Sequence, residues 1–395
     1  MANRPPSTFR TLGHFDYPGM PAEAGLRRWT TKLIQRVRGK EENPFVARDK
    51  LRLASSDRLD RLVPPPACGP LLREMQETFA DWIEEPEPSN WMQLVVLPPC
   101  DRNNLVQQWA EQQQFEVVAA PQRDRILTAG DASELPAVEL PAVESAAAQG
   151  EHVLVIPRLE QWFLRHRRGL DLVRCLLDRL ALLRRHCVVG CNSWAWGFLS
   201  RAVGADLALP HPVTFESFTT DRLQGWFGEL AENGETEART FRRSLDGKDI
   251  FATNEDGAPQ SDYLATLAAQ SFGIPWIAWH LWRSSLRLGP KPEDGGEEKF
   301  PDEQTLWVTE PEEFDLPASH RGSALLTLHA LLLHDTLTAE QVHTVLPSID
   351  ESNLLTALIN NGFVEQENDH FRCRAVAYPT IRRALNDAGF PMDRL

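Results

Sequence analysis

Hydrophobic and polar positions follow two alternating patterns from Gln93 onward. Short runs of consecutive apolar residues alternate with stretches in which apolar residues recur every three or four positions. The runs predict strands that are buried on both faces, and the periodic stretches predict amphipathic helices. Their alternation predicts a parallel α/β sheet. We expect strands at 94–97, 115–119, 153–156, 187–190 and 207–209, and helices at 104–113, 170–185 and 194–203.

The last part of the chain, from about Gly322, has a different order of elements. Helical spacing predicts three short helices, and two β-type segments then flank the turn residues Glu367–Asp369. Thr338 precedes the second helix and is a suitable N-cap. Three helices followed by a hairpin are the order of a winged helix. A terminal helix follows at 379–389.

The segments between these two parts complete the predicted division of the chain. Residues 221–230 and 263–286 have helical spacing, whereas 288–319 is rich in Pro, Gly, Asp and Glu, with one strand-like piece at 305–309. We therefore predict five regions: a basic N-terminal helical arm over 1–90, an α/β core over 91–215, a helical lid over 216–287, an acidic linker over 288–321 and a winged helix over 322–395.

Charge is unevenly distributed along the chain. The net charge is −15, yet residues 1–62 hold 13 Lys and Arg against 7 Asp and Glu, a balance of +6. Apolar residues at 26, 29, 33 and 37 give this arm an amphipathic helix. Residues 26–38 could bind a protein partner's groove or an anionic membrane surface, or could pack on the chain's own core. The candidate interaction residues are Trp29, Arg27, Arg28, Lys32 and Arg36.

Composition excludes several classes of protein. We find no apolar run of the roughly 18–20 residues that a membrane span requires, and Met1–Tyr17 lacks the apolar core of a secretory signal. The six cysteines are scattered without a CxxC pair, which favours buried free thiols over a zinc site. We expect a cytoplasmic protein of bacterial type with no metal, and peripheral contact with a membrane is the alternative.

The segment after the first core strand has the frame of a phosphate-binding P-loop. A working P-loop uses glycines to close backbone N–H groups around phosphate, a Lys for the β- and γ-phosphates, and a Ser or Thr for Mg²⁺. On this frame the first Gly position is Leu97, the Lys position is Asn103 and the Ser/Thr position is Asn104. The strand, turn and helix of a P-loop are therefore predicted here, but the side chains that bind nucleotide are absent.

Residues 91–286, with the winged helix behind them, resemble the AAA+ ATPases of the branch shared by origin-recognition and STAND-type proteins. The resemblance implies a P-loop NTPase-like sheet, a helical lid and a nucleotide site, with Asn103, Asn104 and Asn192 in that degenerate site. It also implies a Mg²⁺-binding Asp-Glu pair, which Pro157 and Arg158 replace here, with Glu160 as the only nearby carboxylate. Trp276 replaces the lid arginine that such proteins often carry.

These losses predict the absence of ATPase activity. Charge-assisted contacts contribute about 1.5–3 kcal/mol each, so losing three weakens nucleotide binding by roughly 4–9 kcal/mol. We expect no cofactor, or weak ATP or ADP binding, and a catalytically inactive regulatory or scaffold protein that acts through protein–protein interaction.

One alternative is an ATP/ADP switch that binds nucleotide through backbone groups and Asn192. The other is a DNA-associated regulator that uses Arg372 and Arg374, although a balance of −4 over 322–395 disfavours nucleic acid.

Three further features have both a structural and a functional interpretation. Asn192 could position a γ-phosphate, or it could cap the helix that follows. Trp276, Trp279 and Trp282 form one helical face, which predicts core packing or a protein-binding patch. The string Arg165–Arg168 could be a solvated turn, or it could bind a phosphate or an acidic partner.

Overall fold

The computed structural model divides the chain into two compact units. The first contains Met1–Phe15, Pro70–Glu216 and Phe314–Leu395, and the second contains Asp16–Gly69 and Ser217–Glu313. The structure describes residues 9–21, 45–55, 59–60, 63, 68–128, 153–232, 240–255, 257, 259–289, 305–310, 314–317, 320–347, 353–393 and 395.

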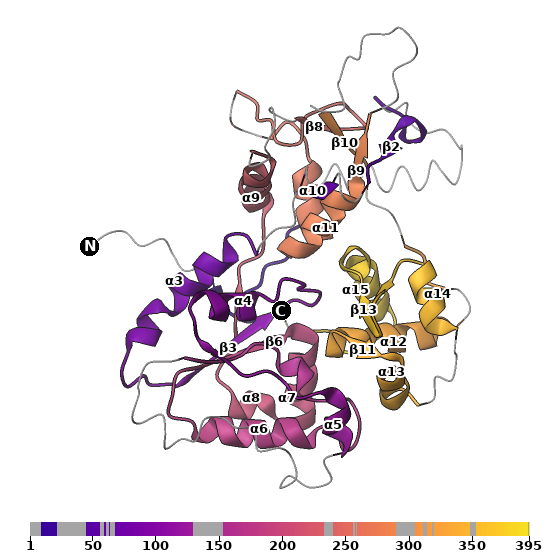
Figure 1. The fold of residues 1–395 in the computed structure, drawn as a ribbon. Coiled ribbons are helices and arrows are strands. Elements are labelled where there is room, and N and C mark those ends of the chain that lie inside the picture. Colours follow the sequence, from indigo (N-terminus) through magenta and orange to yellow (C-terminus); the bar gives the residue numbers. More distant parts are fainter. Residues whose placement is uncertain are drawn as a thin grey trace. The chain divides into compact units, whose positions relative to one another are not determined.

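A six-stranded sheet forms the centre of the first unit (Figure 1). Its strand order is β1-β7-β3-β6-β5-β4. All neighbouring pairs are parallel except β1 with β7, in which Phe9 is opposite Phe215. The strands are β1 (Phe9–Thr11), β3 (Met92–Leu97), β4 (Glu116–Val117), β5 (Leu154–Ile156), β6 (Cys187–Asn192) and β7 (Val213–Phe215).

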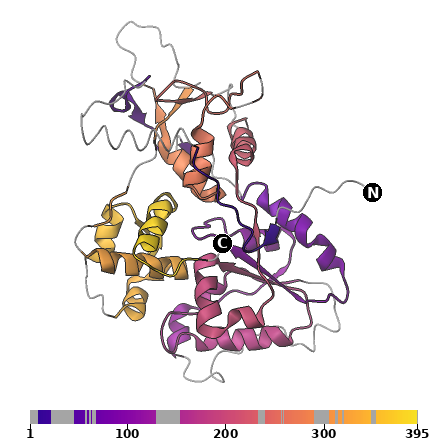
Figure 2. The same cartoon turned by 180° about the vertical axis from the view of Figure 1, so that it is seen from behind.

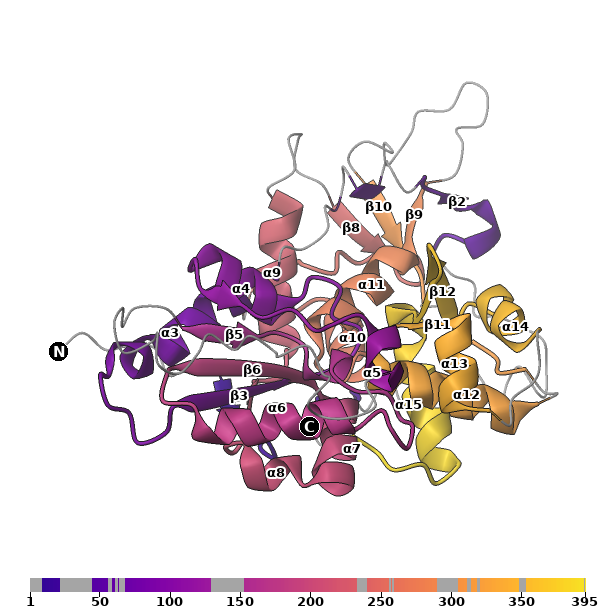
Figure 3. The ribbon, with the colours of Figure 1, turned by 60° about the horizontal axis from the view of Figure 1, so that its bottom comes forward.

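Helices cover both faces of this sheet (Figures 1 and 3). Helices α3 (Leu71–Glu84) and α4 (Leu105–Gln112) lie on one face, and α6 (Asp171–Leu182), α7 (Ser193–Val203) and α8 (Ala205–Ala208) lie on the other. Alternate strand residues such as Leu94 and Val96 pack with the α6 and α7 side chains. Burial on both faces explains why these strands are continuous apolar runs rather than alternating ones.

The loops at the carboxyl ends of β3, β5 and β6 form the edge at which open α/β sheets bind ligands. Register places Leu97 opposite Asn192, so the ends of β3 and β6 coincide. A Cβ at Gly190 would lie 2.2 Å from the Pro157 carbonyl oxygen. The β5 loop can therefore pass close to β6 only because residue 190 has no side chain.

The C-terminal part of the first unit is a winged helix, as predicted. Thr338 caps its second helix in a capping box with Gln341. In the view from behind, the C-terminus lies beside the core of the same unit (Figure 2). The elements are α12 (Arg321–His334), β11 (Leu337–Thr338), α13 (Ala339–Val345), α14 (Leu354–Asn360), β12 (Val364–Glu367), β13 (His370–Cys373) and α15 (Tyr378–Asp387), with β11-β13-β12 as the sheet.

The second unit combines helices with a four-stranded sheet of order β2-β9-β10-β8. The helix expected over 263–286 is two helices, because Gly273 has φ +70° and Pro275 begins a new helix. The elements are β2 (Arg52–Leu53), α9 (Thr220–Glu232), β8 (Thr240–Arg243), α10 (Tyr263–Gln270), α11 (Pro275–Ser285), β9 (Leu286–Leu288) and β10 (Thr305–Val308).

The division into units differs from the predicted region boundaries. The predicted arm over 1–90 contributes β1 and α3 to the first unit and β2 to the second. The predicted linker over 288–321 contributes β10, which pairs in parallel with β8 and antiparallel with β9. These pairings join residues far apart in sequence, so local composition could not reveal them.

Two element predictions need comment. The strand expected at 207–209 is wrong: Gly204 adopts φ +65° and starts the short helix α8, and the strand that completes the sheet is β7. The candidate interaction residues of the arm, at 27–29, 32 and 36, lie outside the described residues.

The tryptophan face of α11 is core. Trp276, Trp279 and Trp282 are 5%, 3% and 0% exposed, and Trp282 stacks on Phe227. This confirms the packing interpretation of their three-residue spacing. In the described part of the chain, no helix is both long and apolar enough to cross a bilayer.

Candidate functional site

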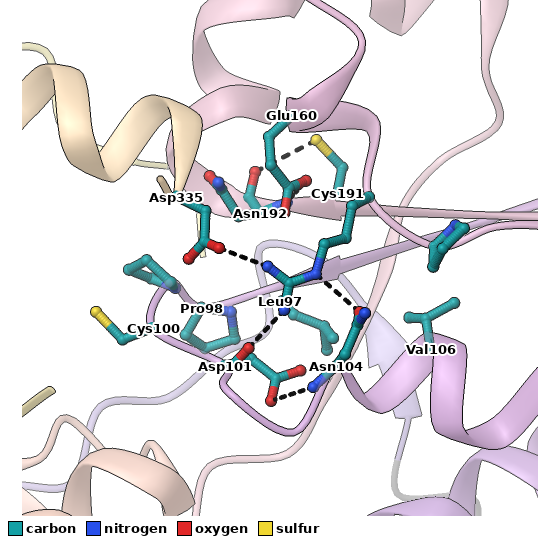
Figure 4. A pocket seen from close by; sticks show the side chains of 13 residues that line it. Leu97, Pro98, Cys100, Asp101, Asn104, Val106, Glu160, Cys191, Asn192 and Asp335 are labelled. Carbon is teal, nitrogen blue, oxygen red and sulfur yellow. Dashed lines mark hydrogen bonds and ion pairs between the residues drawn. The ribbon is translucent and has the colours of Figure 1, made fainter. Parts of the chain in front are cut away.

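The loop that joins β3 to α4 binds its own carboxylate. Asp101 Oδ1 accepts hydrogen bonds from the backbone N–H groups of Asn103 and Asn104 at 3.0 and 3.1 Å, and Oδ2 accepts one from Leu105 at 2.8 Å. Backbone N–H groups at the start of a helix are the usual anion site of a P-loop. In this arrangement an aspartate of the loop itself satisfies them (Figure 4).

Arg158, from the loop after β5, completes the closure of this site. Its Nε donates to Asn104 Oδ1 at 2.8 Å, and its Nη2 donates to the Asp101 backbone carbonyl at 2.7 Å. The third contact is from Nη1 to Asp335 Oδ2 at 2.5 Å. Burial opposes the charged form of Arg158, but Asp335, Glu160 and Asp101 together raise its pKa. The guanidinium is therefore a permanent cation at the centre of the pocket.

Asp335 brings the winged helix into the site. It follows the last residue of α12 with φ +63°, and its side chain is 11% exposed. Arg123 lies against the same end of α12, because it donates to the carbonyls of His334 and Thr336. Cations at a helix C-terminus satisfy carbonyls that have no partner within the helix. Arg123 and Arg158 of the core thus both contact residues at the C-terminal end of α12 in the winged helix.

Glu160 is a buried carboxylate on the β5 loop, in the 3-10 turn Leu159–Gln161. It is 4% exposed, and its Oε2 accepts a hydrogen bond from the Asn192 backbone N–H at 3.1 Å. Burial raises the pKa of Glu160 to about 7, although Arg158 opposes the shift. At pH 7 about half of the molecules therefore hold Glu160 in its neutral form, which is a poor ligand for Mg²⁺ because this metal prefers ionised carboxylates.

The three residues predicted to bind nucleotide differ in whether their side chains line the pocket. Asn104 and Asn192 both line the pocket, whereas the structure gives Asn103 a role only through its backbone N–H. Asn192 Oδ1 accepts from the Ala195 N–H at 2.7 Å and caps α7, as the structural interpretation of this residue proposed. Its Nδ2 is buried and has no partner among the described residues.

The pocket itself is small. The volume open to the centre of a water molecule is about 20 Å³. One water needs roughly 10–15 Å³ by this measure, so the space holds a water or two. The described residues contain no group of three or more His, Cys, Asp or Glu side chains placed to hold a metal ion.

Sequence reasoning missed three of the residues that define the site. Asp101 could have been recognised as a side-chain cap, because an Asp shortly before a helix commonly accepts its first N–H groups. From the sequence, Arg158 could be interpreted only as the residue that stands in place of a Mg²⁺-binding carboxylate. Asp335 is 177 residues away from Arg158, and no local pattern connects them.

The first unit thus combines an open, mostly parallel α/β sheet with a winged helix. One solved structure that aligns with this chain is the Aeropyrum pernix ORC2 protein in ADPNP–ADP complexes, with a TM-score of 0.38 and 9% identity over 86% of this chain and 95% of that chain. No protein-family model and no curated protein matches the chain.

Two further solved structures also align with most of this chain. The Aeropyrum pernix ORC1 protein in complex with DNA has a TM-score of 0.34 and 15% identity, over 86% of this chain and 98% of that chain. Cdc6p from Pyrobaculum aerophilum has a TM-score of 0.29 and 14% identity, over 82% of this chain and 96% of that chain.

Proposed function

We propose that this protein is a catalytically inactive AAA+-like regulatory or scaffold protein that acts through a protein partner. The observation that carries the proposal is the position of Asp101. Its carboxylate accepts three N–H groups that a P-loop would offer to phosphate. A nucleotide would have to displace an anion that is covalently part of the loop.

The charges around the pocket support the same conclusion. Asp101, Glu160 and Asp335 bring three carboxyl groups to a pocket that has one lining guanidinium, that of Arg158. A triphosphate would meet carboxyl groups in place of Lys and Mg²⁺. The residues of this pocket therefore do not fit a nucleoside triphosphate, and we assign no step of catalysis to them.

The contacts of the winged helix favour a role in packing within the unit over a role in binding DNA. Arg372 lies 3.7 Å from Glu367, and Arg374 donates to the Gly362 carbonyl. Glu365 pairs with Arg102 of the β3 loop. The basic residues near the wing are thus engaged by the unit itself, although the ORC1 protein with a similar fold was solved in complex with DNA.

A turnover assay tests the proposal. We expect purified protein with Mg²⁺ and ATP to release no phosphate above the protein-free rate, and Glu160→Gln and Asn192→Ala to be equally silent. Mg²⁺-dependent turnover that disappears in either variant would overturn the proposal.

The two alternatives give different results with the same protein. Tight ATP or ADP binding without turnover would favour the nucleotide switch. Salt-sensitive binding of a DNA duplex that is lost on Arg372→Glu and Arg374→Glu would favour the DNA-associated regulator.

A further inference from the structure

Arginine side chains without a partner are concentrated in one part of the first unit. Arginines 158, 174, 185 and 382 form ion pairs, and others donate to carbonyls. Among the described residues of this unit, the arginine side chains with neither an ion pair nor a hydrogen bond are Arg165, Arg167, Arg168, Arg201 and Arg321.

Three of these arginines lie on one tight turn after β5. The Leu164 N–H donates to the Gly169 carbonyl at 3.0 Å, and the Gly169 N–H donates to the His166 carbonyl at 2.9 Å. A Cβ at Gly169 would lie 2.4 Å from the Leu164 carbonyl oxygen, so only glycine permits this closure. The backbone of the turn is therefore fixed, while Arg167 and Arg168 are exposed.

A fourth arginine, Arg201 at the C-terminal end of α7, acts on the same region. Burial, together with the guanidinium charges of Arg165 and Arg201, lowers the pKa of the His329 side chain to about 4. Arg165 is itself partly desolvated, which lowers its pKa. We call Arg165, Arg167, Arg168 and Arg201 the basic surface. The basic surface thus combines arginines from two segments that are distant in sequence.

We propose that the basic surface binds an acidic segment of a protein partner, in which several Asp or Glu side chains pair with these guanidinium groups. Arginine forms bidentate hydrogen bonds with carboxylates, and a fixed backbone reduces the entropy lost on binding. The proposal rests on the proposed function, because it names the chemistry of the protein partner through which the scaffold acts.

The remaining surface favours an acidic protein over nucleic acid. The whole chain has a net charge of −15 and a pI of about 5.3, which opposes every anionic ligand and most strongly a DNA duplex, because a duplex carries one negative charge per roughly 1.7 Å of its axis. Single-stranded nucleic acid requires exposed aromatic rings for stacking. Within the described residues, the large exposed aromatic side chains are Tyr17 and Phe45, and both belong to the second unit.

The test compares two doubly charge-reversed variants of the full chain. Arg167→Glu with Arg168→Glu removes two exposed charges of the basic surface. Arg73→Glu with Arg174→Glu is the matched control, because it changes the net charge by the same amount at two other exposed arginines of this unit. The probe is a fluorescent peptide of alternating Glu and Gly, titrated at low salt, with a labelled DNA duplex in parallel.

We expect the peptide to bind wild type and the control with affinities within about threefold, and to bind the Arg167/Arg168 variant at least about tenfold more weakly. Equal binding to all three proteins, or no binding to wild type at low salt, would overturn the proposal. A duplex that binds tighter than the peptide and is lost in the same variant would also overturn it and would assign the surface to nucleic acid.

Nucleotide binding measured on the same three proteins separates this inference from the proposed function. ATP binding by all three proteins, together with loss of peptide binding in the Arg167/Arg168 variant alone, would favour the nucleotide switch over the scaffold and leave the acidic-partner surface intact. Thermal unfolding of each variant confirms that the exposed substitutions leave the fold unchanged.

Discussion

Arg158 and Asp335 form an ion pair that joins the pocket of the core to the winged helix. The nitrogen Nη1 of Arg158 lies 2.5 Å from Oδ2 of Asp335, and the two side chains are only 14% and 11% exposed. The same guanidinium contacts Asn104 and the Asp101 carbonyl of the β3 loop. Arg158 therefore links the β3 loop of the core to the winged helix within one unit.

Breaking this pair should destabilise the protein strongly. Asp335→Ala removes the partner of a buried guanidinium, which costs about 3–5 kcal/mol of unfolding free energy. We expect Arg158→Met to cost a similar amount, and the double variant to cost about 1–3 kcal/mol less than the sum. Urea unfolding measures all three. The exposed pair Asp171 and Arg174 is the control, where Asp171→Ala should cost less than about 1 kcal/mol. Additive costs for the buried pair would contradict a direct interaction.

Removing the carboxylate of Asp101 should free the anion site of the loop. Asp101→Ala leaves three N–H groups at the start of α4 without their acceptor, which costs about 1–2 kcal/mol. Inorganic phosphate should then raise the melting temperature of this variant but not that of wild type, because a ligand of the native state stabilises it. An equal response of both proteins at matched ionic strength would show that Asp101 does not fill the site.

The burial of Glu160 should make stability depend on pH. Its pKa rises to about 7 in the folded protein from about 4.5 in the unfolded chain, so the folded state holds the proton more tightly. This contribution is fully present below about pH 4.5 and is lost as the pH rises through 7, with a total of up to about 3 kcal/mol. Glu160→Gln cannot ionise. The stability of wild type relative to Glu160→Gln should therefore fall between pH 5 and 7, and a difference independent of pH would refute the assignment.

Gly190 should tolerate no side chain. A methyl group there would lie 2.2 Å from the Pro157 carbonyl oxygen, which belongs to the loop that carries Arg158. We expect Gly190→Ala to lower the unfolding free energy by about 1–3 kcal/mol. Gly225→Ala is the matched control, because no atom lies within 4 Å of its added carbon and alanine favours the helix by about 0.5–1 kcal/mol. An unchanged unfolding free energy for Gly190→Ala would mean that strand β6 and the β5 loop are not in close contact.

Local patterns predicted much of the fold. The continuous apolar runs gave β3, β5 and β6, and helical spacing gave α4, α6 and α7, because burial on both faces of a sheet leaves a direct signal in sequence. Strand β7 was misplaced because it has three residues, whereas Leu207 was mistaken for part of a strand although it is 91% exposed on α8.

The site was predictable only in part. The degenerate loop and the missing lysine could be read from residues 97–104, since a motif is local by definition. The filling of that loop by Asp101, Arg158 and Asp335 depends on contacts across 57 and 177 residues. The sequence predicted which nucleotide-binding groups this loop lacks, and the structure showed which side chains contact it.

Equilibrium binding of ATP and ADP to the wild-type protein, with and without Mg²⁺, tests the central claim most directly. If Asp101 and Arg158 fill the phosphate site, titration should show no saturable binding up to about millimolar nucleotide. Binding at micromolar concentration would contradict the account, because a nucleotide would then displace Asp101 from three hydrogen bonds that this structure assigns to the native state.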